Sequence, residues 1–218
     1  MHSVELTVDA DGQSRAYAFI RERILRGAYR SGQRLRAQEI AEAIELSRTP
    51  VREALSRLAH DGFVDKDSAG GFLVRTMTPA AIQDLFQVRE VLELEAARLA
   101  LTRVDDAWLD QLGEYLEEAQ DLFDAGKPAA ALMAARCLYI GIAQRSGNQL
   151  LLKMLESIND QVHIVGASLV ERVPARAREV MEENCGVLAA LRIRDGDRLA
   201  QAIRDHIRRS RNLIFLGQ

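Results

Sequence analysis

The sequence predicts a mostly α-helical protein, in which a small N-terminal unit of helices with a β-hairpin precedes an antiparallel bundle of helices. Three observations lead to this fold class. Apolar residues make up 48% of the 218 residues, whereas aromatic residues make up only 5%. Leu and Ala are abundant, and both favour helices over strands. Apolar side chains also recur every three or four residues over most of the chain, as they do on one face of an α-helix.

Composition and cysteine usage favour a cytoplasmic protein without membrane contact. No apolar run approaches the ~18 residues that are needed to span a bilayer. The first thirteen residues include Glu5, Asp9 and Asp11, which do not suit a secretory signal. Cys137 and Cys185 lack metal-type spacing, and they fit a reducing compartment. We expect both to be buried as small apolar side chains.

The N-terminal part divides into an arm and three helices. Residues 1–13 are expected to form a flexible arm, and a first helix then covers about 14–26. A second helix covers about 37–44, and a third begins near Ser47 and reaches about residue 60. Ser47 is expected to cap the third helix, and proline is tolerated in its first turn because the N–H is not needed there.

A hairpin, a linker and a bundle follow. Phe63-Val64 and Phe72-Leu73-Val74 predict two strands that are joined by a polar turn. With the helices they complete a domain over 14–75, and residues 76–79 form a linker. From residue 80 to 218, six helical segments with short connections predict an antiparallel bundle.

The second and third helices have the arrangement of a helix-turn-helix, in which the first residues of the later helix contact base edges. Arg48 and Arg52 are one turn apart, and the arginine fork can pair with guanine O6 and N7. Ser47 and Thr49 can donate hydrogen bonds to phosphate. The predicted DNA contacts also include two arginines before the second helix and two glycines at the hairpin tip: Arg34, Arg36, Gly70 and Gly71.

The charge distribution gives weaker support for DNA binding. The net charge is -3, but residues 14–75 carry 12 Lys and Arg against 8 Asp and Glu, whereas residues 76–218 carry 17 against 21. A single exposed arginine more commonly only solvates a helix surface. The order of helix, turn, basic helix start and glycine-tipped hairpin makes DNA binding the stronger interpretation.

These motifs resemble the winged helix-turn-helix of GntR-type bacterial transcription regulators. The similar residues extend from Gly32 to Leu35, from Glu39 to Ala41, from Ser47 to Leu55 and from Leu58 to Val64. Gly70-Gly71 stands where many members have Arg-Gly, so no arginine contact is expected from the wing. The resemblance implies a homodimer that binds a near-palindromic operator on double-stranded DNA.

The bundle resembles the FCD-type effector domain of the FadR-like branch of this family. The similar segments are Val88–Glu93, Ala143–Asn148 and the helix that follows Asp195-Gly196-Asp197. This resemblance implies dimerisation through the domain and binding of an inducing small molecule inside the bundle. It also implies a divalent metal in many members, held by one Asp and three His.

The metal site of that branch is predicted to be absent from this chain. The resemblance places its ligand positions at Ala135, Tyr139, Asn184 and His206. One imidazole cannot replace four ligands of suitable geometry, so we expect no metal or other cofactor. An improvised site from Tyr139, Asn184 and His206 remains the alternative.

A small organic effector is expected at polar side chains within the bundle. Arg89 can pair with a carboxylate bidentately, or it can pair with Glu93 one turn on. Tyr139 and Asn184 are either ligand contacts or satisfied core groups, and His163 lies on an apolar helix where a core histidine is common. The predicted ligand contacts are Arg89, Tyr139, Asn184, His206 and His163.

The expected function is ligand-responsive regulation of transcription, with repression relieved by a small organic acid or a related metabolite. One alternative is a metal-free acyl-CoA or fatty-acid sensor of the same family. Another is a helical enzyme with an appended DNA-binding module. The sequence contains no paired carboxylates, nucleophile-base order or phosphate loop of specific spacing, so we expect no enzymatic activity.

Overall fold

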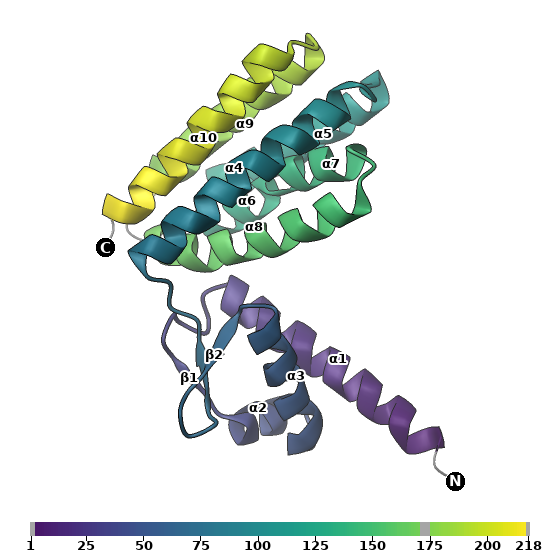
Figure 1. Cartoon of the computed structure of the whole chain (residues 1–218), viewed down its shortest axis with the longest axis vertical. Coiled ribbons are helices and arrows are strands. Elements are labelled where there is room, and N and C mark those ends of the chain that lie inside the picture. The colour runs from purple at the N-terminus through teal and green to yellow at the C-terminus, as the bar shows by residue number, and fades with distance from the viewer. Residues whose placement is uncertain (1–2, 171–174, 217–218) are drawn as a thin grey trace. The chain divides into compact units, whose positions relative to one another are not determined.

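The computed structural model describes residues 3–170 and 175–216, which form two compact units (Figure 1). The N-terminal unit extends to Met77, and the C-terminal unit begins at Thr78. Helices account for most of the described residues, and the one sheet among them has three short antiparallel strands. The mostly α-helical fold class is therefore confirmed.

The described part of the N-terminal unit contains three helices and three strands. Its helices are α1 (Ser3–Leu25), α2 (Ala37–Ala43) and α3 (Arg48–His60). Its strands are β1 (Arg34–Leu35), β2 (Val64–Lys66) and β3 (Phe72–Val74), which lie in the order β1-β3-β2. The predicted hairpin is present as β2 and β3, in which Val64 pairs with Val74. The sequence does not predict β1, because two residues are too few to show a periodicity.

Helix α1 begins at Ser3, so the flexible arm expected over residues 3–13 is corrected to helix. Residues 1 and 2 of that arm lie outside the described range. This stretch has no proline, and Gly12 disfavours a helix by only ~1 kcal/mol relative to alanine. Gly12 is also buried, and a Cβ atom placed on it would lie 3.5 Å from Cβ of Pro50. This packing against the start of α3 favours continuation of the helix toward the N-terminus.

One face of α3 is buried, as its periodicity predicts. Val51, Leu55 and Leu58 are fully buried in the unit. Helix α3 packs against α1, α2 and β2, and Ile20 and Ile24 of α1 are buried in the same unit. Burial of each such side chain contributes about 1.5–3 kcal/mol, so this face determines how the helix is oriented.

The described part of the C-terminal unit contains seven helices. They are α4 (Pro79–Leu101), α5 (Asp106–Asp124), α6 (Pro128–Ala135), α7 (Cys137–Arg145), α8 (Gln149–Val170), α9 (Ala175–Arg192) and α10 (Gly196–Leu216). The sequence predicts six helices, because it treats α6 and α7 as one. The break falls at Arg136, which keeps helical angles (φ −61°, ψ −26°) and has no neighbouring proline or glycine to mark it. The sequence places the start of α9 at Pro174, which lies outside the described residues.

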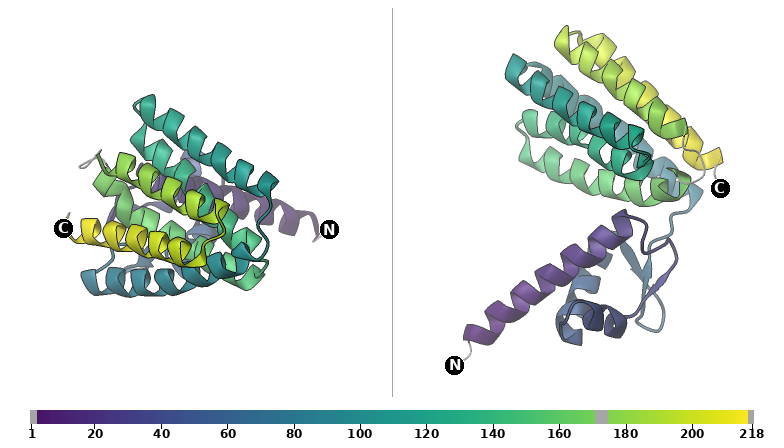
Figure 2. Two further views of the ribbon diagram at one scale, coloured as in Figure 1. Left: turned by 90° about the horizontal axis from the view of Figure 1, so that it is seen from above. Right: turned by 180° about the vertical axis from the view of Figure 1, so that it is seen from behind.

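The helices of the C-terminal unit pack into the expected bundle (Figure 2). Helix α10 lies against α4 and α9, whereas α5 contacts α6, α7 and α9, and α4 contacts α7. Cys137 and Cys185 are both exposed, which corrects the expectation that they are buried. Each lies on the outer side of its helix, next to a residue that faces the bundle interior. Within the described ranges, no helix combines the length and the apolar character that a bilayer crossing requires.

Candidate DNA-reading surface and effector site

The start of α3 presents its polar side chains to solvent. Ser47, Arg48, Thr49 and Arg52 are all exposed, whereas Pro50 between them is buried. Ser47 occupies the N-cap position with extended angles (φ −72°, ψ 164°). Ser47 is thus the N-cap residue as predicted, but within the described chain its side chain makes no capping hydrogen bond. The hydroxyl is therefore not occupied by the backbone of its own helix.

An open depression of ≈ 690 Å³ lies beside these residues on the N-terminal unit. It is lined by Gln13, Thr49, Arg52, Glu53, Ser56 and Arg57. The sequence does not indicate Gln13, because the residue belongs to the part of α1 that is expected to be an arm. Arg57 is held in place, since its guanidinium lies 4.5 Å from the ring centre of Tyr17. The depression thus adds a neutral amide and a fixed arginine to the predicted reading residues.

A single aspartate holds the turn of the β2–β3 hairpin, which is the wing of the winged helix. Asp67 Oδ1 accepts hydrogen bonds from the backbone N–H groups of Ala69 (2.9 Å) and Gly71 (2.7 Å), and its Oδ2 pairs with Arg34. The Gly71 hydrogen bond and the Arg34 guanidinium hold the pKa of Asp67 below its ordinary value. A Cβ atom on Gly71 would lie 2.6 Å from Asp67 Oδ2, and Gly70 has a φ of +75°. Both glycines therefore have a structural role in the turn.

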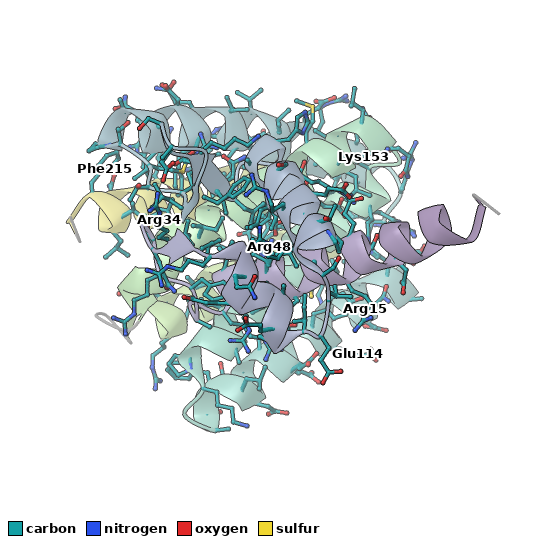
Figure 3. The ribbon with its side chains drawn as sticks, turned by 90° about the horizontal axis from the view of Figure 1, so that it is seen from below. Arg15, Arg34, Arg48, Glu114, Lys153 and Phe215 are labelled. Atoms are coloured by element: carbon teal, nitrogen blue, oxygen red, sulfur yellow. The ribbon has the colours of Figure 1, made fainter. Side chains whose placement is uncertain are left out.

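Two further predicted contacts already have partners within the N-terminal unit. Arg34 is half-exposed and bound to Asp67 across the wing, and Arg36 lies 2.9 Å from Glu39 and is largely exposed. Figure 3 shows the positions of Arg34 and Arg48 in a view from below. Surface ion pairs of this kind contribute little net stability, because solvent screens their charges. Either arginine can therefore exchange its carboxylate for a phosphate at little cost.

The C-terminal unit brings four of the five predicted ligand contacts together. Arg89 comes from α4, Tyr139 from α7, Asn184 from α9 and His206 from α10, and all four are buried. Tyr139 Oη donates a hydrogen bond to Asn184 Oδ1 (3.1 Å), and its ring stacks on His206 with centres 5.0 Å apart. The Arg89 guanidinium lies 5.8 Å from the ring centre of Tyr139. We call these four residues the effector cluster.

The contacts of His206 define its tautomer. Its Nδ1 lies 2.8 Å from Glu183 Oε2, and its Nε2 lies 3.4 Å from a terminal nitrogen of Arg89. Since a guanidinium only donates, Nε2 must accept and Nδ1 must carry the proton that it donates to Glu183. Burial lowers the pKa of His206 below its ordinary value of 6.5, although the hydrogen bond to Glu183 opposes this shift. The ring is therefore neutral at pH 7.

Arg89 and Glu93 form a buried ion pair on α4. Nε of Arg89 donates to Glu93 Oε1 at 2.7 Å, and the two side chains are 5% and 3% exposed. The alternative pairing considered for Arg89 is thus present. It does not exclude ligand binding, because the guanidinium has five N–H donors.

His163 does not join the effector cluster. It is partly buried on α8, in a short segment that is not assigned to the C-terminal unit. The structure therefore gives no support for His163 as a ligand contact. One histidine on an apolar helix is weak evidence for a ligand contact, because the sequence does not show which face of the helix the ring occupies.

The residues at the family's metal-ligand positions do not fit a divalent metal. Ala135 has no ligand atom in its side chain, and Asn184 donates toward its carbonyl oxygen (3.5 Å). Tyr139 Oη is bound to Asn184, and His206 Nε2 faces the positive charge of Arg89. Among the described residues, no group of three or more His, Cys, Asp or Glu could hold a metal ion. The geometry also gives no support to an improvised site, since the polar atoms of Tyr139, Asn184 and His206 are already bound to one another, to Glu183 and to Arg89.

These observations define the class of protein: a winged helix-turn-helix joined to a helical domain with a buried polar site. The family model described as bacterial regulatory proteins, gntR family, matches residues 13–74. The FCD domain model matches residues 84–209. The chain belongs to the GntR family of transcription regulators with an FCD domain, and it is a DNA-binding regulator.

Sequence relatives of this chain are regulators of the same type. The HTH-type transcriptional regulator McbR of Escherichia coli K12 is 29% identical over 89% of this chain and 86% of its own length. The Nta operon transcriptional regulator of Aminobacter aminovorans is 32% identical over 62% of this chain and 63% of its length. The transcriptional repressor GlaR of E. coli K12 is 25% identical over 77% of this chain and 90% of its length.

The fold is also similar to a solved structure. The structure of E. coli McbR (YncC) superposes with a TM-score of 0.85 at 26% sequence identity, covering 94% of this chain and 98% of that one. The order of a winged helix-turn-helix and a helical FCD domain is therefore shared across nearly the whole chain.

Proposed function

We propose that this regulator is a repressor that binds a near-palindromic operator as a homodimer and is released by a small organic acid. The observation that carries the proposal is the effector cluster, which holds Arg89 in a buried setting among helices from four parts of the bundle. The Arg89 guanidinium has five N–H donors, and its bonds to Glu93 and His206 do not use all of them, so it is suited to an anionic ligand of small size. The repressor GlaR is a relative, and its name supports the proposed sign of regulation.

The start of α3 would read the operator. Arg48 and Arg52 would contact base edges, while Ser47 and Thr49 would bind phosphate from exposed positions. Arg34 and Arg36, together with the wing glycines 70 and 71, would follow the DNA backbone. The bacterial chromosome is the DNA concerned, so the proposed location is the cytoplasm.

A dimer is supported by an exposed apolar strip on α4. Val88 and Val91 are one turn apart and 48% and 67% exposed. Apolar side chains of this size on one helix face suit an isologous contact with a second copy of the chain. A two-fold dimer would present two reading helices to two half-sites.

The effector cluster favours a compact polar ligand over the alternatives. Arg89 and His206 of the cluster are bound to the neighbouring carboxylates of Glu93 and Glu183, and this polar setting suits a polar acid better than an acyl chain. Catalysis is not part of the proposal, because the cluster binds and positions groups without a nucleophile activated by a base.

The direct test is binding of small carboxylic acids to wild-type protein and to Arg89→Leu, measured by the shift in melting temperature. Acids that stabilise the wild type should not stabilise Arg89→Leu, because the anionic group loses its partner. Arg98→Leu is the matched control, since Arg98 is an exposed arginine of the same helix paired with Glu95. Equal stabilisation of all three proteins would contradict the proposed site.

A further inference from the structure

The carboxylate of Glu93 uses only one of its oxygens. Oε1 accepts the hydrogen bond from Nε of Arg89, one turn earlier on α4. Oε2 is buried and has no hydrogen-bond partner in the part of the chain that the structure describes. The side chain is 3% exposed, so bulk solvent does not supply a donor. Glu93 therefore has an unused acceptor next to the guanidinium of the effector cluster.

Such an acceptor is unusual in a folded protein. The great majority of buried polar atoms have a hydrogen-bond partner, and a charged group without one is costly. An arginine fork commonly engages both oxygens of a carboxylate. Here a terminal nitrogen of Arg89 is directed toward His206 Nε2 instead, and Nε alone reaches Glu93. The arrangement of three side chains thus keeps Oε2 free of Arg89.

We propose that Glu93 Oε2 accepts a hydrogen bond from a hydroxyl or amino group of the effector, whose anionic group binds Arg89. The inference rests on the proposed function, because it retains the small acid and specifies a second group that the acid carries. Both oxygens belong to one carboxylate, and Oε1 is bound to Arg89, so Oε2 lies close to the guanidinium. The donor therefore lies on the carbon next to the acid group or on the following one.

The charges around the site favour the same class of ligand. Arg89 and Glu93 carry opposite charges, and His206 is neutral in the tautomer that its contacts require. A 2- or 3-hydroxy acid, or the corresponding amino acid, places its negative group on Arg89 and its donor on Glu93. A simple acid of the same length leaves Oε2 unsatisfied, and a second carboxylate in place of the donor is repelled by it. Glu93 is thus a residue that determines specificity.

The experiment compares matched acids by titration calorimetry on the full-length wild-type protein. Lactate and alanine are compared with propionate, and 3-hydroxybutyrate and 3-aminobutyrate with butyrate. At least one donor-bearing acid should bind about 10- to 100-fold more tightly than its matched simple acid, as expected for a hydrogen bond to a buried carboxylate. Equal affinities within every pair would overturn the inference, because they are the result expected if a water molecule satisfies Oε2.

Two variants test whether Glu93 is the residue that causes the preference for donor-bearing acids. Glu93→Gln places an amide N–H group where Oε2 stood, so it should reduce the preference for the amino acids, whose ammonium group can only donate, to about threefold or less. Glu95→Gln, an exposed glutamate of the same helix, should keep it. An undiminished preference for the amino acids in Glu93→Gln would overturn the assignment to this residue. If Glu93→Gln does not fold, the comparison of matched acids on the wild-type protein still tests the inference.

The outcomes also separate this inference from the proposed function. If wild type binds none of the six acids at millimolar concentration, the small-acid site fails and the inference fails with it. If the acids bind without preference for the donor, and Arg89→Leu abolishes binding, only the inference is overturned.

Discussion

The two functional regions of this regulator hold their arginines in opposite ways. Arg48 and Arg52 at the start of α3 are exposed, and their positions follow from a buried face on the other side of one helix. Arg89 in the effector cluster is 4% exposed and is fixed by contacts with other helices. The polar start of α3 is thus a local feature of one helix, whereas the effector cluster exists only when four helices have packed. Changes to the first should alter binding, and changes to the second should also alter stability.

The largest expected effect is on the buried ion pair. Glu93→Ala leaves the Arg89 charge without its partner, and loss of one partner of a buried pair costs about 3–5 kcal/mol of unfolding free energy. Glu95→Ala breaks an exposed pair on the same helix and should change the free energy of unfolding far less, because solvent screens that pair. Urea unfolding measures both, and equal losses would remove the contrast between buried and exposed pairs.

Operator binding should respond to the reading surface by a smaller amount. Arg52→Ala should weaken it by roughly 1–3 kcal/mol and relax the preference at one base pair. Arg36→Ala should weaken binding to all sequences alike and reduce the salt dependence, as a phosphate contact does. Fluorescence anisotropy with operator variants measures both. Unchanged affinity and base preference in Arg52→Ala would exclude the base-reading role.

The buried histidine should make stability depend on pH. The folded protein binds a proton at His206 less readily than the unfolded chain, because burial lowers its pKa below 6.5. Its contribution is therefore fully present above pH 6.5 and is lost as the pH falls from 6.5 through the lowered value. His206→Gln should lose this part of the slope between pH 7.5 and 5, whereas His60→Gln, with a 90% exposed ring, should keep it. Identical slopes in all three proteins would mean that burial does not bias the titration.

The smallest expected signal is metal content. Elemental analysis of protein purified without added metal should show no stoichiometric transition metal, because the donor set around His206 is unsuitable. One metal ion per subunit would overturn the interpretation of Ala135, Tyr139 and Asn184.

Local signals in the sequence are sufficient for much of the fold. The apolar spacing of Val51, Leu55 and Leu58 identifies the buried face of α3, and the Thr78-Pro79 pair marks the start of α4, where Thr78 Oγ1 accepts from the N–H of Ala81. The break at Arg136 has no such signal, because neither neighbouring residue is a proline or glycine and Arg136 itself keeps helical dihedral angles.

Contacts between distant residues are harder to predict. The sequence suggests Arg89, Tyr139, Asn184 and His206 as candidates only through resemblance, and their mutual hydrogen bonds depend on how the helices pack. The unpaired oxygen of Glu93 cannot be predicted from the sequence, because it depends on how the Arg89 guanidinium is oriented in the folded bundle.

The most direct test of the account is release of operator DNA by an acid that binds at Arg89. Fluorescence anisotropy of labelled operator should fall when this acid is added to the wild type, and it should not change for Arg89→Leu, which still binds DNA through α3. Release from both proteins, or retention of DNA by both, would contradict the claim that the effector cluster controls the reading surface.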